Sequence, residues 1–114
     1  MTQHDPLVRV RHMLDHAREA VALAGPRCRQ DLDADRVFSL ALVRLMEIVG
    51  EAAARVPEEF REQHRQVPWR DMADLRNRLI HGYDSINHDI LWAIVKGELP
   101  PLVTQLESII TREG

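Results

Sequence analysis

Residues 75–83, Leu-Arg-Asn-Arg-Leu-Ile-His-Gly-Tyr, contain the side chains of this 114-residue chain that are best suited to phosphate chemistry. An imidazole changes its charge near neutral pH, so His81 can give or take a proton. Arg76 carries a permanently charged planar guanidinium that can bind two phosphate oxygens at once. Such groups are sufficient to cleave RNA, because an imidazole can move protons while a guanidinium stabilises the crowded phosphorane.

The spacing of these residues limits how they can meet. On a regular helix Asn77 and His81 share a face, whereas Arg76 points about 140° away from His81. Arg76 can approach the ligand of His81 if the last turn before Gly82 unwinds, or the two groups can meet across a symmetric dimer interface, which we favour. Spacing alone is more typical of a structural role, with surface arginines and a histidine that caps a helix end.

Length, charge and cysteine content narrow the class of protein. A chain of 114 residues is expected to form one domain, over residues 1–114. The formal net charge of −3 argues against a protein that grips nucleic acid with its whole surface, but it allows a local basic cleft. One cysteine, Cys28, excludes an internal disulfide, and there is no apolar run typical of a signal peptide or a membrane span. We therefore expect a soluble protein of the cytoplasm.

Two long apolar patterns predict the first helices. Residues 5–24 have a typical Asp-Pro start and apolar positions at helical spacing, and Gly25-Pro26 ends the pattern. A second and longest helix is expected from Asp31 or Asp33 to about Val56, where the following proline blocks continuation.

Apolar residues of this second helix fall on two stripes. One stripe consists of Val37, Leu40, Ala41 and Ile48, and the other of Phe38, Leu42, Leu45, Val49 and Ala52. A small bundle buries one stripe easily, so the second stripe indicates either a central helix or a protein partner. We favour a contact in a dimer or heteromer. Gly50 interrupts the helix at a cost of about 1 kcal/mol relative to alanine, which suggests close packing there.

Shorter patterns follow along the chain. Residues 57–64 can form a short helix, and Pro68-Trp69 is typical of the first turn of the next helix. This helix is expected to continue to His81, where Gly82 is a natural left-handed terminator. The phosphate-binding candidates would then lie at a helix C-terminus.

The last part of the chain predicts further helices and no strand. Asn87 can cap one helix, which Gly97 and Pro100-Pro101 should break before residues 102–111 resume the pattern. The sequence therefore predicts an all-α fold, a small antiparallel bundle of four to five helices, which we expect to be dimeric.

Residues 76–83 resemble the Arg-x-x-x-x-His-x-Tyr motif of HEPN superfamily proteins of the HepT-like toxin group. Other segments are similar to that group in order and spacing: Ile48-Val49-Gly50-Glu51-Ala52 to its Ile-Gly-Glu-Ala segment, Val67-Pro68-Trp69 to its Ile-Pro-Trp helix start, and Leu91-Trp92-Ala93-Ile94 with Leu99-Pro100 to its ending. The likeness extends from about Val37 to Leu106.

The resemblance implies an all-helical HEPN bundle that dimerises with the motifs of both subunits lining a shared cleft. It implies a metal-independent endoribonuclease toxin that acts on RNA and needs no cofactor. Arg76 and His81 would be the catalytic residues, Asn77 would orient the substrate or the histidine, and Arg78, at a variable position, would at most contact RNA.

The resemblance also implies a partner. In this group the tyrosine after the histidine is modified by a cognate MNT-type nucleotidyltransferase antitoxin, which transfers AMP to the hydroxyl. Tyr83 occupies that position. AMP would add bulk and negative charge two residues from His81 and so repel an RNA phosphate.

Three assignments remain open from the sequence. Glu51 can support an active-site arginine, but a glutamate on such a helix more often reaches solvent or a structural partner. The other five histidines form no convincing metal site. Finally, the chain can be a catalytically silent helical module that binds the nucleotidyltransferase, a role that intact Arg76 and His81 argue against.

Overall fold

The computed structural model describes residues 5–83 and 85–113, and it is built of helices. Their bounds are α1 Pro6–Ala24, α2 Asp31–Ala34, α3 Arg36–Ala54, α4 Glu58–Gln63, α5 Trp69–Ala73, α6 Leu75–Leu79, α7 His88–Ala93, a π-helical segment Ile94–Glu98 and α8 Leu99–Glu113. Across these ranges the β pairing is limited to one isolated antiparallel bridge, between Ile80 and Ile86. The prediction of an all-α fold is confirmed.

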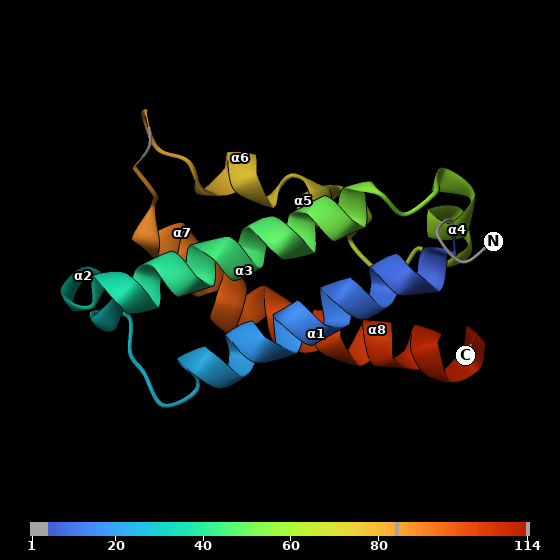
Figure 1. The fold of residues 1–114 in the computed structure, drawn as a ribbon, viewed down its shortest axis with the longest axis horizontal. Helices are drawn as coiled ribbons and strands as arrows, with labels where there is room; N and C mark the ends of the chain where they lie inside the picture. Colours follow the sequence, from blue (N-terminus) through green and yellow to red (C-terminus); the bar gives the residue numbers. More distant parts are fainter. Residues whose placement is uncertain (1–4, 84, 114) are drawn as a thin grey trace.

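Three long helices form the body of the molecule. α1 packs against α3 and α8 and runs in the opposite direction to both (Figure 1). α5 and α6 pack on α3 from the other side, and they carry the segment that leads to the loop after α6. Both ends of the described chain lie at the same end of the bundle (Figure 1). No helix in the described ranges is long and apolar enough to cross a membrane.

The two apolar stripes of α3 have different surroundings. The stripe that begins at Phe38 is buried in the common core, on the helix that packs against α1, α5 and α6. On the other stripe Val37 is 77% exposed and Leu40 is 51% exposed, while Ile48 is partly buried. α3 is therefore not a fully enclosed central helix, and one of its apolar faces has no cover within the described chain.

The start of the longest helix differs from the prediction. The helix expected from Asp31 or Asp33 is divided, because Asp35 has an extended backbone with φ −123° and ψ 97°. The Asp35 carboxylate accepts a hydrogen bond of 3.1 Å from the backbone N–H of Phe38, so Asp35 is the N-cap of α3. The preceding α2 is a single short turn. The prediction of Asp31 or Asp33 as the cap of the longest helix was therefore wrong, and Asp35 also binds Arg27 at 2.8 Å.

The end of the motif helix also differs from the prediction. The helix expected to begin at Pro68-Trp69 is divided at Asp74, and it ends at Leu79 instead of His81. Ile80 is extended, with ψ 133°, and pairs with Ile86 across the loop. Gly82 has φ +85°, which confirms the left-handed conformation, although it lies in the loop and not directly after the helix.

The expected break before residues 102–111 does not occur. Asn87 caps α7 as predicted, its side chain accepting a hydrogen bond of 3.0 Å from the N–H of Ile90. α7 then continues through the π-helical segment directly into α8, and the N–H of Leu99 donates to the carbonyl of Ile94, five residues earlier. The wider π turn lets the chain pass Pro100 and Pro101 in the first turn of α8, where prolines are tolerated.

Gly50 lies at the closest approach of α3 and α5. A Cβ atom at this position would be 3.0 Å from the backbone carbonyl oxygen of Met72 and 3.6 Å from the Cβ of Leu75. The expected close packing at Gly50 is confirmed. By contrast, a Cβ on Gly97 would meet no heavy atom within 4 Å.

A cluster of aspartates and arginines surrounds the start of α3. Arg27 binds Asp31 at 3.2 Å and Asp35 at 2.8 Å, and Arg29 binds Asp33 at 3.0 Å. The pKa of Asp35 is lowered below its usual value of 3.8, first by the hydrogen bond from Arg27 and then by that from Phe38. The pKa of Asp31 is lowered mainly by the N–H of Cys28, and that of Asp33 mainly by His88.

Substitution of the two glycines by alanine should have opposite effects on stability. Gly97→Ala should raise the free energy of unfolding by up to about 1 kcal/mol, because it improves helix propensity without a clash. Gly50→Ala should lower it by about 1 kcal/mol, because displacing the Met72 carbonyl, which accepts the N–H of Asp74, outweighs the same gain. Chemical denaturation of the two variants measures both values, and equal effects would contradict the close packing.

The aspartate cluster should make stability depend on acid pH. Because the folded-state pKa values lie below those of the unfolded chain, the contribution is complete above the usual value of 3.8 and is lost as pH falls through the lower folded values. The triple variant Asp31→Asn, Asp33→Asn, Asp35→Asn should be less stable at pH 7 and should lose less stability on acidification. Asp15→Asn, on the exposed side of α1, serves as a control, and parallel pH curves for wild type and the triple variant would refute the assignment.

Candidate functional site

Arg76 lies on α6 with its guanidinium exposed. Among residues 5–83 and 85–113 no hydrogen bond or ion pair engages this guanidinium within 4 Å. Arg78, two residues along the same helix, is by contrast bound by Glu98. An exposed guanidinium without a protein partner can bind an anion without first breaking an internal ion pair.

His81 follows α6 on a tight loop instead of ending the helix. The backbone N–H of His81 donates to the carbonyl of Ser85 at 2.8 Å, the Ser85 hydroxyl donates back to the His81 carbonyl, and the Asn87 N–H donates to the Leu79 carbonyl at 2.9 Å. These bonds close the loop like a small hairpin. The imidazole stays exposed, and because His81 lies outside the helix, the helical offset of five residues no longer sets its position relative to Arg76.

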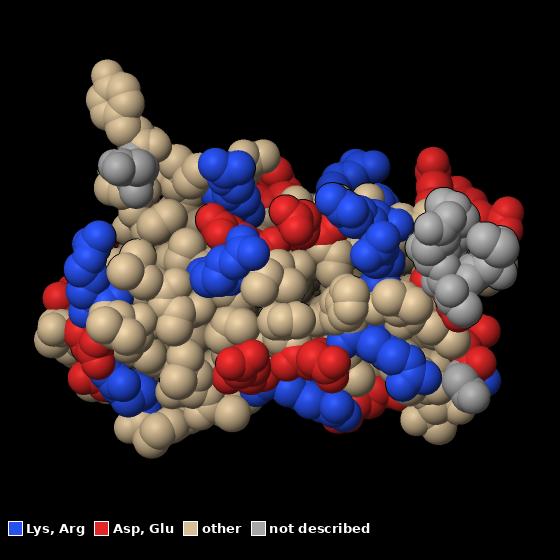
Figure 2. Space-filling model, in the orientation of Figure 1, with Lys and Arg blue, Asp and Glu red and all other residues tan. Residues whose placement is uncertain are grey.

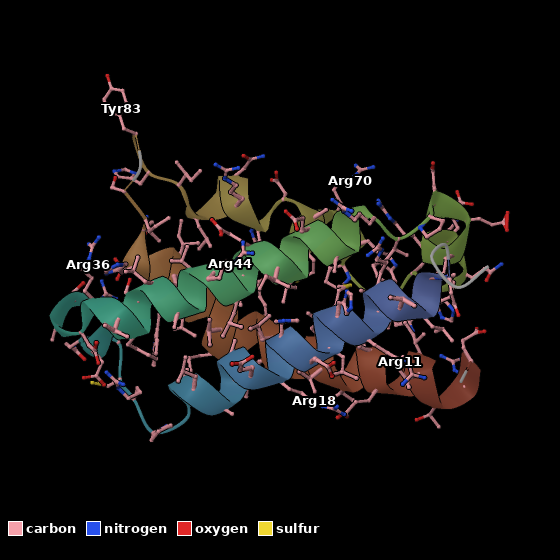
Figure 3. The ribbon with its side chains drawn as sticks, viewed as in Figure 1. Arg11, Arg18, Arg36, Arg44, Arg70 and Tyr83 are labelled. Carbon is pink, nitrogen blue, oxygen red and sulfur yellow. The ribbon has the colours of Figure 1, made fainter. Side chains whose placement is uncertain are left out.

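Tyr83 occupies the tip of the same loop. Its side chain is fully exposed and extends away from the body of the molecule (Figure 3). A packing role within the chain is therefore excluded. The hydroxyl is accessible to a second protein, as an enzyme that modifies Tyr83 would require.

Two adjoining grooves follow the uncovered face of α3. The first, of about 520 Å³, is lined by both Arg76 and Tyr83 and by apolar residues that include Leu40 and Ile80. The second, of about 400 Å³, is lined by Arg76 and Glu51. Arg76 belongs to both grooves, so it marks the place where they meet. Figure 2 shows the uncharged area over the first half of α3 and the charged side chains that follow it along the helix.

Asn77 and Arg78 are both engaged with neighbouring side chains. The Asn77 amide donates to the Asp74 carboxylate at 2.7 Å. Arg78 binds both carboxylate oxygens of Glu98, at 3.0 and 2.6 Å, and this pairing raises the arginine pKa. The fork ties α6 to the π-helical segment and helps to position the motif. The suggested RNA contacts of Asn77 and Arg78 stay predictions, and Arg78 would have to share its guanidinium with Glu98.

Glu51 lies on the exposed side of α3, in the groove that it shares with Arg76. In the described part of the chain it forms no ion pair with an arginine within 4 Å. Its role as a supporting acid stays a prediction.

The structure contains a hydrogen-bonded chain of three side chains that the sequence did not predict. The Ser39 hydroxyl lies 3.1 Å from Nε2 of His88, and Nδ1 of His88 lies 2.8 Å from the Asp33 carboxylate. The carboxylate favours a proton on Nδ1, which leaves Nε2 to accept from Ser39. The three residues come from α7, α2 and α3, so no local spacing could have indicated them. They fix the start of α7, and with it the end of the loop that carries His81.

A second feature that escaped the sequence analysis is the pair Arg44 and Glu47, on α3. Both residues line the groove that contains Arg76 and Glu51. Their spacing of three residues was a signal for a surface pair, but only the packing of α6 shows that this pair lies at the candidate site.

Comparison with known proteins agrees with these features. The sequence profile of the family described as "Ribonuclease HepT-like" matches residues 13–109. This chain belongs to the HepT-like ribonuclease family. The matched range includes α3, most of α1 and α8, α6 and the loop that presents His81 and Tyr83.

Relatives with ribonuclease names cover most of the HepT-like chain. A candidate RNase from Caldanaerobacter subterraneus is 42% identical over 84 residues, which is 74% of this chain and 75% of that protein. A probable ribonuclease HepT from Thermococcus cleftensis is 37% identical over 82 residues, 72% of this chain and 74% of that protein. A candidate RNase from Methanocaldococcus jannaschii is 34% identical over 98 residues, 86% of this chain and 81% of that protein. No solved structure gives a significant match.

The comparisons confirm the resemblance to HepT-like proteins and the prediction that the chain is an endoribonuclease. They leave the roles of single residues untested. Among the described residues no group of three or more His, Cys, Asp or Glu side chains could hold a metal ion.

Proposed function

We propose that this HepT-like chain is a homodimeric, metal-independent endoribonuclease toxin of a toxin-antitoxin pair, which acts in the cytoplasm. The observation that carries the proposal is the available guanidinium of Arg76 at the junction of two grooves, next to a loop that exposes His81. Arg76 binds the scissile phosphate, His81 transfers protons, and Asn77 orients the substrate or the imidazole.

The cleavage step requires only these groups, the RNA itself and water, which serves the proton transfer that His81 does not. The 2′-oxygen of the ribose attacks phosphorus and loses its proton, a P–O2′ bond forms, and the P–O5′ bond breaks as the 5′-oxygen gains a proton. His81 serves one of these two proton transfers, and Arg76 stabilises the negative charge that gathers on the non-bridging oxygens.

A homodimer accounts for the uncovered face of α3. Val37 and Leu40 form an exposed apolar strip, and Ile80 adds to it across the groove. Exposed apolar patches of this kind are typical of protein interfaces. A second copy seated there would cover the strip and bring its own motif toward the Arg76 of the first subunit, so that Arg76 and His81 from different subunits share a cleft.

Loss of either catalytic group should abolish most cleavage. Arg76→Ala and His81→Ala should each lower the rate of RNA cleavage by about 10²–10⁴-fold with no change in Tm, because both side chains are exposed. A fluorogenic RNA assay measures the rates, and Arg11→Ala on α1 is the matched control. Full activity of His81→Ala, or no cleavage by the wild type, would disprove the enzyme proposal and favour a silent binding module.

Mixing the two inactive variants distinguishes a shared site from separate ones. Random exchange makes half of the dimers mixed, and each mixed dimer has one intact site if Arg76 and His81 come from different subunits. The mixture should therefore recover about a quarter of the wild-type rate. If each site belongs to one subunit, mixing restores nothing, which refutes the shared cleft while the ribonuclease proposal stands.

Tyr83 is the proposed point of control by an MNT-type nucleotidyltransferase antitoxin. Transfer of AMP to its hydroxyl adds a phosphate charge two residues from His81, which repels the RNA backbone. The exposed position of Tyr83 supports this proposal, since the partner can approach the hydroxyl without unfolding the loop.

Co-expression with the nucleotidyltransferase should add one or more AMP groups to the toxin and inhibit it. Because the chain contains one tyrosine, Tyr83→Phe should abolish the mass increase and, when expressed alone, should keep wild-type cleavage. Intact-mass spectrometry and the RNA assay on the same samples measure both effects. AMP on Tyr83→Phe, or an active modified toxin, would count against the switch.

A further inference from the structure

Arg44 lies beside the proposed active site but has no assigned role. It belongs to α3, and it lines the 400 Å³ groove together with Arg76. Figure 3 shows Arg36 and Arg44 on α3, on the side of that helix that faces α5 and α6. The guanidinium groups of Arg44, on α3, and Arg76, on α6, therefore line the same groove.

Glu47 holds Arg44 only weakly. One guanidinium nitrogen of Arg44 lies 3.3 Å from one Glu47 oxygen, and the two side chains are 66% and 38% exposed. An exposed ion pair at this spacing contributes little to stability. A phosphate can thus replace the Glu47 carboxylate at small cost, which is unlike the situation of a buried pair.

Other arginines with partners are held more firmly. Arg78 binds Glu98 through two nitrogens, with the shorter contact at 2.6 Å. Arg61 donates to the carbonyls of Val56 at 2.9 Å and Ala54 at 3.0 Å, and so satisfies the last turn of α3. These arginines have structural roles that binding an anion would disrupt, whereas Arg44 has none of comparable strength.

A rigid helix sets the spacing of the basic groups. Arg36 and Arg44 are eight residues apart on α3, which corresponds to about 12 Å along the helix axis. Arg36 lines the groove of about 520 Å³, and both Glu47 and Arg76 line this groove as well as the one that contains Arg44. The groove that contains Arg44 and Arg76 lacks Leu40 and Ile80, the apolar residues assigned to the dimer contact, so it stays open to a nucleic-acid backbone beside that contact.

We infer that Arg44 is a second phosphate-binding residue of the ribonuclease, which binds the RNA backbone next to the phosphate held by Arg76. Glu47 keeps the Arg44 guanidinium in the groove until an RNA phosphate displaces the Glu47 carboxylate. The inference rests on the proposed function, because it takes RNA to be the ligand of the groove.

Salt-dependent binding of a non-cleavable RNA tests Arg44 separately from catalysis. The probe is a fluorescent, fully 2′-O-methylated RNA oligonucleotide, whose affinity is measured by anisotropy at several salt concentrations. Arg44→Gln should weaken binding and reduce the slope of log affinity against log salt by about 0.7, the value for one lost contact with a single strand. Arg11→Gln, which removes an exposed arginine on α1, should leave the slope unchanged (Figure 3).

Glu47→Gln separates a phosphate-binding role from a structural one. If the ion pair merely stabilises α3, Arg44→Gln and Glu47→Gln break the same contact and should change binding in the same direction. If Arg44 binds phosphate, Glu47→Gln should strengthen RNA binding while Arg44→Gln weakens it. Opposite signs, with unchanged Tm values, support the inference.

Changes of the same sign in the two variants overturn the inference, and three further outcomes separate it from the proposed function. An unchanged slope for Arg44→Gln, in a wild-type protein that binds and cleaves RNA, refutes the role of Arg44 alone. Absence of RNA binding by the wild type refutes both proposals. A wild type that binds the probe through Arg44 yet cleaves no RNA supports the role of Arg44 and refutes the catalytic proposal.

Discussion

The close packing of α5 against α3 at Gly50 is the contact on which the position of the candidate site depends. A side chain at this position would press on the Met72 carbonyl, so glycine favours the present short distance between the two helices. α6 follows α5 after a single break at Asp74, so the position of α5 on α3 also determines where α6 lies. Arg76 reaches the grooves along α3 because the helix that carries it is held this close. A wider separation would move its guanidinium away from Arg44 and Glu51.

The remaining contacts fix the loop after α6 from both sides. On one side, Arg78 binds Glu98 and ties α6 to the π-helical segment. On the other, His88 is held by Asp33 and Ser39, which fixes the start of α7. The loop between these anchors is short and closed by backbone hydrogen bonds, so its side chains are presented on a fixed backbone. Such an arrangement suits catalysis, because an exposed imidazole gains most from a support that does not move.

Local signals in the sequence were sufficient for the helices that are capped and patterned by their own residues. The buried stripe from Phe38, the cap at Asn87 and the left-handed Gly82 are all present as predicted. The predicted helix ends were wrong where contacts with residues distant in the sequence determine them. Arg27 helps to select Asp35 as the cap of α3, and pairing with Ile86 extends Ile80 and so ends α6 early. Arg44 was overlooked for the same reason, since its importance comes from Arg76 on another helix.

Within the motif, the two arginines differ in their availability to a ligand. Arg76 and Arg78 are two residues apart on α6 and have the same chemistry, yet Arg78 is bound by Glu98 through both oxygens while Arg76 has no such partner in the described chain. A substrate phosphate competes with Glu98 at Arg78, whereas at Arg76 it meets no competing carboxylate among the described residues. Phosphate binding at Arg76 therefore breaks no ion pair of the described chain, and at Arg44 it breaks only an exposed one. Protein contacts, more than the motif itself, determine which charges on this face can act on RNA.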